Sequence, residues 1–260
     1  MAFRRRGVAT VLDDLRQAGC LKARFPRVEQ EAWTTVVALN TSGGVAGGDR
    51  LDSAFAVQEG ACATITAQAA ERFYRVLPES PPSQVRTRIA VADGGAAEWL
   101  PQETILFDRC ALDRRLEVDL GHDAWFLGVE SLVFGRAAMG ESVQHGWIRD
   151  LIHVRHNGRL LLHDAVRLDG EVAAALRRKA IADGARAVAT IVHIAPGAEQ
   201  LLDRLRSALT DQPVESGASA WNGMVLQRIM AHDGAALRAA VTAPLGMLRA
   251  RRPLPRVWQC

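Results

Sequence analysis

A short pattern recurs three times in the first half of the chain: an apolar, strand-like stretch that ends in a glycine turn. The three copies are Val57-Gln58-Glu59-Gly60, Val91-Ala92-Asp93-Gly94 and Val118-Asp119-Leu120-Gly121. Recurrence at about 30 residues is typical of stacked β-coils, since each coil buries its apolar face only against its neighbours. The pattern therefore favours a β-solenoid-like stack, and a β-sandwich is the alternative.

Turn signals separate short apolar stretches throughout residues 24–168, and this texture predicts many short strands. The predicted strands cover residues 33–39, 54–57, 62–67, 85–91, 97–100, 116–120, 125–129, 148–155 and 160–163. The last two are joined by Asn157-Gly158, a dipeptide typical of β-hairpins. We therefore expect a mainly β protein in which residues 1–168 form a β-helix-like or solenoid-like body.

After Leu168 the sequence alternates between helical and strand-like segments. The spacing of apolar residues predicts helices at 171–183, 198–209 and 234–248, and strands at 187–194, 214–221 and 224–230. Pro244 lies inside the last of these helices and is expected to kink or split it. Two prolines are expected to keep the tail extended, and an exposed Trp258 there could dock against another surface. Residues 169–260 are thus predicted to form a smaller α+β part packed on the β body.

Charge and cysteine usage exclude several classes of protein. The net charge is only +3, and the arginines are spread along the chain, whereas a nucleic-acid-binding protein concentrates them on one face. The four cysteines are far apart and form no Cys-x-x-Cys pair, which argues against a disulfide framework and a structural zinc site. No apolar run reaches the ~20 residues that span a bilayer, and residues 1–10 lack the apolar stretch of a signal peptide. We expect a cytoplasmic protein that binds neither nucleic acid nor membrane.

The glycine-rich run GGVAGGD at residues 43–49 has the glycine spacing of a phosphate-binding loop but not its chemistry. Asp49 and Arg50 stand where that loop requires lysine and serine or threonine, and an aspartate would repel the phosphates. The paired glycines instead permit positive φ angles and a close approach to another segment. Asp49 is then expected either to cap the loop amides or to face a cavity.

Several acidic residues end the apolar stretches. Alignment of the repeats on their glycines, Gly94 and Gly121, places Glu103 and Glu130 at equivalent positions. Asp164 ends a fourth strand-like run, directly after His163. Oxygen ligands stacked along a solenoid would suit the passage of a hard or borderline divalent cation. The alternative is that each acid pairs with an arginine, for which the candidates are Arg72, Arg75, Arg109, Arg136 and Arg167.

Six segments, in order along nearly the whole chain, resemble the UreD (UreH) family of urease accessory proteins. They are residues 19–26, 43–51, 66–75, 98–101, 135–141 and 253–258, and they include the strings GGVAGGD and TAQAAERFYR. The resemblance implies a β-helical body with a helical C-terminal part. It also implies a chaperone or scaffold and not an enzyme, which agrees with the absence of a Gly-x-Ser-x-Gly nucleophile motif.

The resemblance further implies partners and a cargo. Such a protein binds apo-urease, recruits UreF and through it the GTPase UreG, and passes nickel(II) through an internal polar path, with no permanently bound cofactor. By position, Asp49, Glu130 and Asp164 are the expected metal-contacting residues of that path, and Glu103 and His163 are weaker candidates. Asp164 departs from the glutamate expected there.

Two other functions are compatible with parts of the sequence. One is a pure assembly scaffold through which nickel never passes. The other is a β-solenoid carbohydrate-active enzyme that uses Glu103 and Glu130 as paired acids. A single tyrosine and an aromatic content of 5% argue against the second, because sugar-binding sites use aromatic platforms.

Overall fold

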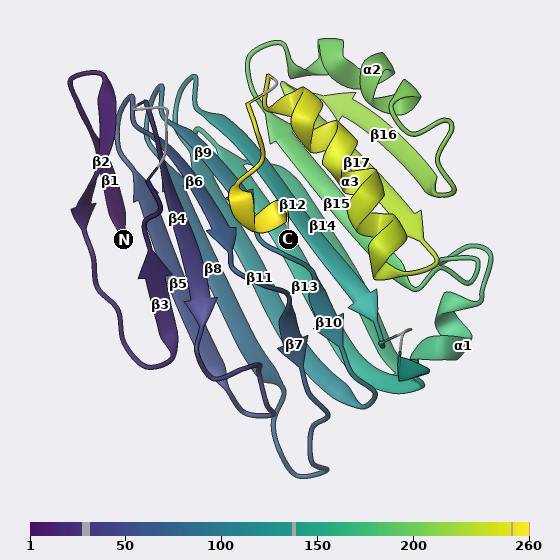
Figure 1. The fold of residues 1–260 in the computed structure, drawn as a ribbon. Helices are drawn as coiled ribbons and strands as arrows, with labels where there is room; N and C mark the ends of the chain where they lie inside the picture. Colours follow the sequence, from purple (N-terminus) through teal and green to yellow (C-terminus); the bar gives the residue numbers. More distant parts are fainter. Residues whose placement is uncertain (28–31, 137–138, 251, 260) are drawn as a thin grey trace.

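A computed structural model describes residues 1–260 except 28–31, 137–138, 251 and 260 (Figure 1). Strands dominate it and form two sheets, so the prediction of a mainly β protein is confirmed. The seven-stranded sheet contains, in spatial order, β14 (Arg159–Glu171), β13 (His145–His156), β11 (Cys110–Leu120), β8 (Ser83–Val91), β5 (Arg50–Val57), β1 (Ala2–Arg6) and β2 (Ala9–Asp14).

The second sheet is ten-stranded and carries all of the C-terminal strands. Its main path is β16 (Glu215–Trp221), β17 (Met224–Ala231), β15 (Ala187–Ile194), β12 (Trp125–Phe134), β9 (Ala96–Leu100), β6 (Cys62–Ala67), β4 (Trp33–Asn40) and β3 (Leu21–Arg24). Beside this path, β10 (Thr104–Leu106) pairs with both β12 and β7 (Glu71–Phe73). In the described part of the chain, no helix is long and apolar enough to cross a membrane.

The chain alternates between the two sheets through its central part. Strands β4, β6, β9 and β12 pair in parallel in one sheet, and β5, β8, β11 and β13 pair in parallel in the other. In β11, residues alternate strictly between buried and more exposed. One face of this strand therefore points to the opposite sheet and the other points away from it. Side chains that point inward from both sheets form the core.

The register differs from the predicted repeat at its third copy. Val57 lies opposite Val91 as predicted, but Val91 lies opposite Leu120 and not opposite Val118. The residue that corresponds to Gly94 (φ 60°) is therefore Asp123 (φ 52°). Aspartate tolerates this left-handed conformation, so no glycine marks the turn in the sequence. The predicted equivalence of Glu103 and Glu130 is consequently wrong.

The C-terminal helices match the predictions unevenly. Helix α1 (Val172–Leu176) is much shorter than the predicted segment 171–183, while η2 (Ala198–Leu201) and α2 (Leu202–Ser207) together cover most of 198–209. Helix α3 (Gly234–Leu248) has the predicted bounds and begins at Asp233, whose side chain accepts a hydrogen bond from the Ala236 N–H at 2.9 Å. It continues through Pro244 unsplit.

Helix α3 lies on the outer face of the ten-stranded sheet, against β15 and β17 (Figure 1). Leu237, Val241 and Leu245 of this helix are fully buried in the apolar cluster beneath it. Since β15 pairs with β12, and β14 runs through residue 168, the predicted C-terminal part continues the sheets of the body. The division at residue 168 stays a prediction.

The tail after α3 packs back onto the protein. Trp258, in the short helix η3 (Arg256–Trp258), is only 8% exposed and its indole N–H donates to the Leu100 carbonyl at 3.1 Å. Trp258 is thus docked and not exposed, because the apolar face beneath α3 extends to the tail and covers this ring.

Candidate functional site

A buried ion cluster lies between the two sheets, and Arg114 of β11 is its centre. The Arg114 guanidinium donates from Nε and Nη2 to the two carboxylate oxygens of Asp150 at 2.8 and 2.7 Å. Asp150 lies directly opposite Arg114 in the parallel pair of β11 and β13, so both side chains point to the same side of the sheet. This pair is a bidentate ion pair in the interior.

Glu130 reaches the same guanidinium from the opposite sheet. Its Oε2 lies 2.7 Å from Arg114 Nη1, and its Oε1 accepts a hydrogen bond of 2.7 Å from the Trp99 indole N–H. The alternation of β12 places Glu130 on the inner face, two residues before the buried Leu132. The hydroxyl of Thr104 accepts a further 2.7 Å hydrogen bond from Arg114 Nη1.

The cluster holds two carboxylates against one guanidinium, and burial shifts the pKa values of Glu130 and Arg114. Burial raises the pKa of Glu130, Arg114 opposes this rise, and the neighbouring Asp150 carboxylate adds to it. Burial by itself would lower the pKa of Arg114, but the two carboxylates raise it overall. Arg114 therefore stays charged, and burial makes Glu130 easier to protonate than an exposed glutamate.

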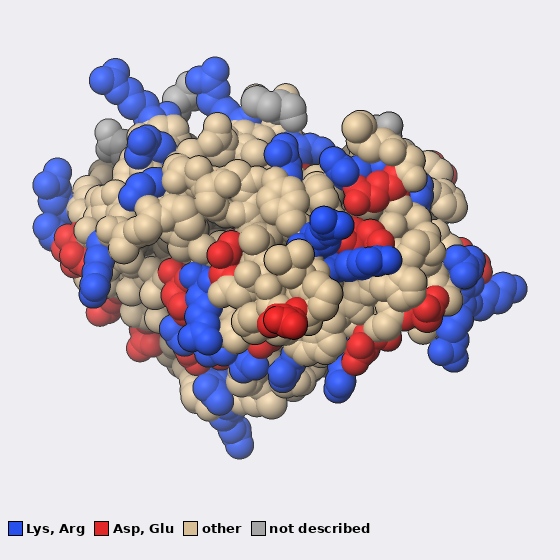
Figure 2. Space-filling model, turned by 90° about the horizontal axis from the view of Figure 1, so that it is seen from below, with Lys and Arg blue, Asp and Glu red and all other residues tan. Residues whose placement is uncertain are grey.

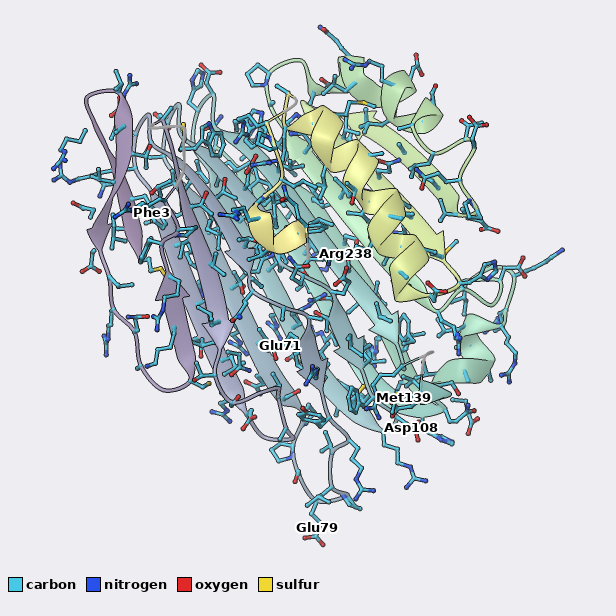
Figure 3. All side chains as sticks on the ribbon, in the orientation of Figure 1. Phe3, Glu71, Glu79, Asp108, Met139 and Arg238 are labelled. Carbon is cyan, nitrogen blue, oxygen red and sulfur yellow. The ribbon has the colours of Figure 1, made fainter. Side chains whose placement is uncertain are left out.

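A cavity of about 270 Å³ adjoins this cluster and is lined by Arg114, Glu130, Trp99, Asn40 and Glu71, among others. Asn40 donates a hydrogen bond of 3.1 Å to Glu71 Oε2. Burial also raises the pKa of Glu71, which hydrogen bonds from Asn40 and the Arg72 N–H partly offset. In Figure 3, Glu71 lies among the strands, whereas Glu79 stands at the tip of a loop.

Polar side chains continue from Glu130 toward the other edge of the sheets. Glu130 lies opposite Thr190 of β15, and Thr190 lies opposite Arg228 of β17. Arg228 Nη2 donates to both oxygens of Asp164 in β14, at 2.7 and 2.6 Å. These residues, together with Glu71, Arg114 and Asp150, define a polar layer between two apolar clusters of the core.

The predicted metal-contacting residues are thus divided among several places. Glu130 and Asp164 both belong to the polar layer, but their partners, Arg114 and Arg228, are not among the arginines predicted to pair with them. Glu103 pairs with Arg238 of α3 at 3.1 Å. His163 stacks edge-on against His153. In the described residues, no group of three or more His, Cys, Asp or Glu side chains is arranged to hold a metal ion.

Asp49 lies outside the polar layer and caps the glycine-rich loop. Its Oδ2 accepts a hydrogen bond of 2.8 Å from the Ala46 N–H. The loop itself has the predicted tight path, since Gly43, Gly44 and Gly48 all have positive φ. A Cβ on Gly44 would lie 2.9 Å from the Arg72 carbonyl oxygen, so only glycine fits there. Of the two roles expected for Asp49, the structure shows the capping role.

Arg114, Asp150, Trp99 and Glu71 are site residues that the sequence patterns do not predict. Arg114 and Asp150 did leave a signal, because each replaces an apolar residue in a period-two pattern of buried positions. Leu112 and Leu116 flank Arg114 in this way, and both are buried. A charged residue at an inward position of a strand indicates a buried ion pair. Glu71 shows no such pattern, because its strand, β7, has only three residues.

A second buried ion cluster joins the tail to the outer face of the ten-stranded sheet. Glu98 is fully buried and accepts hydrogen bonds from Arg249 Nε and Nη2, each 2.9 Å long. Arg252 Nη2 lies 2.5 Å from Glu98 Oε1, and its guanidinium stacks 3.7 Å above the Trp33 ring. The Thr64 hydroxyl donates to Glu98 Oε2 at 2.6 Å. Glu98 and Arg249 are buried and Arg252 is only partly exposed, so the cluster fastens the tail to the sheet.

On the face seen in Figure 2, basic and acidic side chains are interspersed and form no region of one sign. This agrees with the small net charge of +3. A continuous basic surface of the kind that binds nucleic acid is not present on this face.

Comparison with known proteins gives a consistent result over the whole chain. A family model described as UreD urease accessory protein matches residues 1–259. A urease accessory protein UreD of Methylobacterium sp. (strain 4-46) is 46% identical over 258 residues, which cover 97% of this chain and 90% of the relative. A UreD of Sinorhizobium medicae is 45% identical over 256 residues, with 97% and 91% covered. A UreD of Rhodopseudomonas palustris is 43% identical over 252 residues, with 97% and 88% covered.

Proposed function

Since the chain belongs to the UreD family of urease accessory proteins, we propose that it passes nickel(II) through its interior to the active site of urease. In this proposal it is a cytoplasmic scaffold that binds apo-urease and recruits UreF, and through UreF the GTPase UreG. It performs no catalysis itself, and nickel is its cargo and not a resident cofactor. The observation that carries the proposal is the polar layer between the sheets.

The composition of the polar layer suits transport better than storage. Glu130 and Asp164 supply oxygen ligands, but each already holds a guanidinium at 2.7 and 2.6 Å. An incoming cation must compete with Arg114 or Arg228 for these carboxylates, and the like charge of the arginines opposes its binding. Binding at each position is therefore weak, and weak binding allows the ion to move on.

We also infer that the alternation of strands between the two sheets makes the central part of the chain a two-sheeted β-helix. Each passage of the chain then adds one strand to each sheet, from β4 and β5 to β12 and β13. Two sheets with a continuous hydrogen-bonded backbone form rigid walls. Rigid walls would keep the polar layer and the adjoining cavity of about 270 Å³ open without a ligand.

The second candidate function is an assembly scaffold through which nickel does not pass. It is favoured by the observation that Asp49, Glu130, Asp164 and Glu103 all have partners within the protein. The two functions make different predictions for variants that change the polar layer and leave the surface intact.

The test replaces Glu130 and Asp164 by their amides, as Glu130→Gln and Asp164→Asn, singly and together. The amides keep an acceptor for Arg114 and Arg228 but lose the negative charge that a cation requires. We expect co-purification with UreF, UreG and apo-urease to persist, and the nickel content of urease to fall several-fold in the double variant. The matched control is Asp13→Asn, which changes an exposed carboxylate paired with Arg4 at the N-terminal edge of the seven-stranded sheet.

Normal nickel content in the double variant, with the complexes intact, would overturn the transport proposal and leave the scaffold. Loss of the complexes would instead show that these residues act in assembly.

A further inference from the structure

Two histidines face each other on the outer surface of the seven-stranded sheet. His153 of β13 and His163 of β14 are direct partners in the antiparallel register of these strands. Their ring centroids are 5.7 Å apart and their planes meet at 73°. His163 is exposed and His153 half-buried, so solvent reaches the pair. The strand pairing fixes the separation of the two Cβ atoms, and only the side-chain torsions remain free to move the rings.

This separation matches what one metal ion requires of two imidazoles. A metal–nitrogen bond of about 2.0–2.1 Å places the ion roughly 3.2 Å from each ring centroid. Two rings on one ion then have centroids about 4.5 Å apart at a right angle and about 6.4 Å apart in a linear arrangement. The observed 5.7 Å lies inside this interval. Adjustment of the side-chain torsions alone would direct a nitrogen of each ring to a shared ion.

We propose that His153 and His163 form a surface site for one borderline divalent transition-metal ion, of which nickel(II) is an example. Imidazole is a preferred ligand of nickel, copper and zinc, and the site contains no thiolate that would favour softer ions. No third His, Cys, Asp or Glu in the described chain completes the site, so water fills the remaining coordination positions. Two protein ligands give a readily reversible site.

The charges around the pair are compatible with a cation. Glu117 of β11 lies opposite His153 in the parallel register and also bonds to Arg88 at 3.1 Å. Its carboxylate places a negative charge on the strand next to the pair, which the Arg88 guanidinium partly offsets. The site is separate from the polar layer, because adjacent residues of a strand point to opposite faces, and Asp164 points inward to Arg228. The inference therefore does not depend on nickel transport through the interior.

The test titrates the full chain with nickel(II) and, separately, with copper(II), and measures affinity by competition with a chromophoric chelator. The variants are His153→Thr, His163→Thr and the double variant, since threonine favours strands and does not ligate these ions strongly. We expect each single change to weaken binding at this site at least tenfold, and the double change to add little, because one imidazole alone cannot chelate. His122→Thr is the control, since His122 is a well-exposed turn histidine at another place.

A second measurement identifies the ligands directly. The electron paramagnetic resonance spectrum of the copper(II) form should show coupling to two imidazole nitrogens, which is lost in either single variant. Wild-type affinity in both single variants, or an unchanged spectrum in the double variant, would overturn the proposal. Because Glu130→Gln should leave this binding intact, a failure of the interior path and a failure of the surface site can be told apart.

Discussion

At the scale of single residues, Arg114 is the side chain on which the interior depends most. It is the only guanidinium in contact with both Asp150 and Glu130 among the described residues. Its removal would leave two buried carboxylates without a countercharge, and breaking a buried ion pair in this way typically costs about 3–5 kcal/mol. The exposed pair of Arg88 and Glu117 has the same chemistry but contributes little, because solvent screens it.

The titration of Glu130 gives a testable pH dependence. Burial raises the pKa of Glu130 in the folded state above the value of about 4.3 expected for the unfolded chain. Between these two values the folded state binds more protons than the unfolded state, so the free energy of unfolding falls as pH rises through the interval. Glu130→Gln removes this group, and its free energy of unfolding should fall less than that of the wild type between pH 4.5 and pH 7.

Urea unfolding at several pH values measures this difference, which amounts to about 1.4 kcal/mol for each unit by which the pKa is raised. Glu117→Gln, at the exposed position, should follow the wild-type pH dependence. Identical pH dependence in Glu130→Gln and the wild type would show that Arg114 fully offsets the effect of burial.

At the scale of elements, the tail is held to the sheet by contacts that are distant in sequence. Arg249 and Arg252 bind Glu98, Arg238 Nη2 donates to the Trp258 carbonyl at 3.0 Å, and the Trp258 indole binds Leu100. The tail thereby connects α3 with β9 on the outer face of the ten-stranded sheet. Its ordered conformation results from these contacts, since the segment has little regular structure of its own.

Trp258→Ala tests how much the docked tail contributes to stability. Truncation of a buried tryptophan removes its apolar contacts and leaves a cavity, at a typical cost of about 3–5 kcal/mol. We expect a loss near the lower end of this range, because the tail can partly collapse onto the sheet. Urea unfolding at pH 7 measures it, with Leu77→Ala, at an exposed loop position, as a control expected to change stability by less than about 0.5 kcal/mol.

The same elements show what the sequence reveals and what it conceals. The bounds of β6, β15 and α3 follow from local apolar periodicity, which the tertiary structure leaves unchanged. Helix α1 ends early because its predicted continuation packs few residues against the core and forms turns. The alignment of the third repeat on Gly121 is wrong because Asp123 takes the position of the turn glycine. Arg114 and Asp150 were missed because charge usually indicates an exposed position, and only the opposite sheet shows that these two are buried.

At the scale of the whole molecule, the described residues form one continuous structure of two sheets. Strands β15 and β17 extend the sheet that contains β12, and the cluster beneath α3 includes Leu127 and Val129 of β12. The C-terminal strands thus share both backbone hydrogen bonds and apolar contacts with the body. Separate unfolding of residues 169–260 would break a sheet in its interior.

We therefore expect a single cooperative unfolding transition. Far-ultraviolet circular dichroism reports the strands of both parts, while tryptophan fluorescence reports positions from Trp33 to Trp258. The two signals should give coincident urea transitions. Two resolved transitions would instead support the predicted division at residue 168 as an autonomous boundary.

The hairpin of β13 and β14 places neighbouring residues in two different environments. His163 faces solvent beside His153, whereas Asp164 faces the interior beside Arg228. Because strand residues alternate with a period of two, a slip by one residue would exchange the imidazole and the carboxylate. A one-residue insertion or deletion in β14 between Arg159 and Asp164 that neither the turn nor a bulge absorbs would therefore exchange the two faces. The register of this one hairpin therefore decides both which imidazoles face solvent and which carboxylate faces the interior.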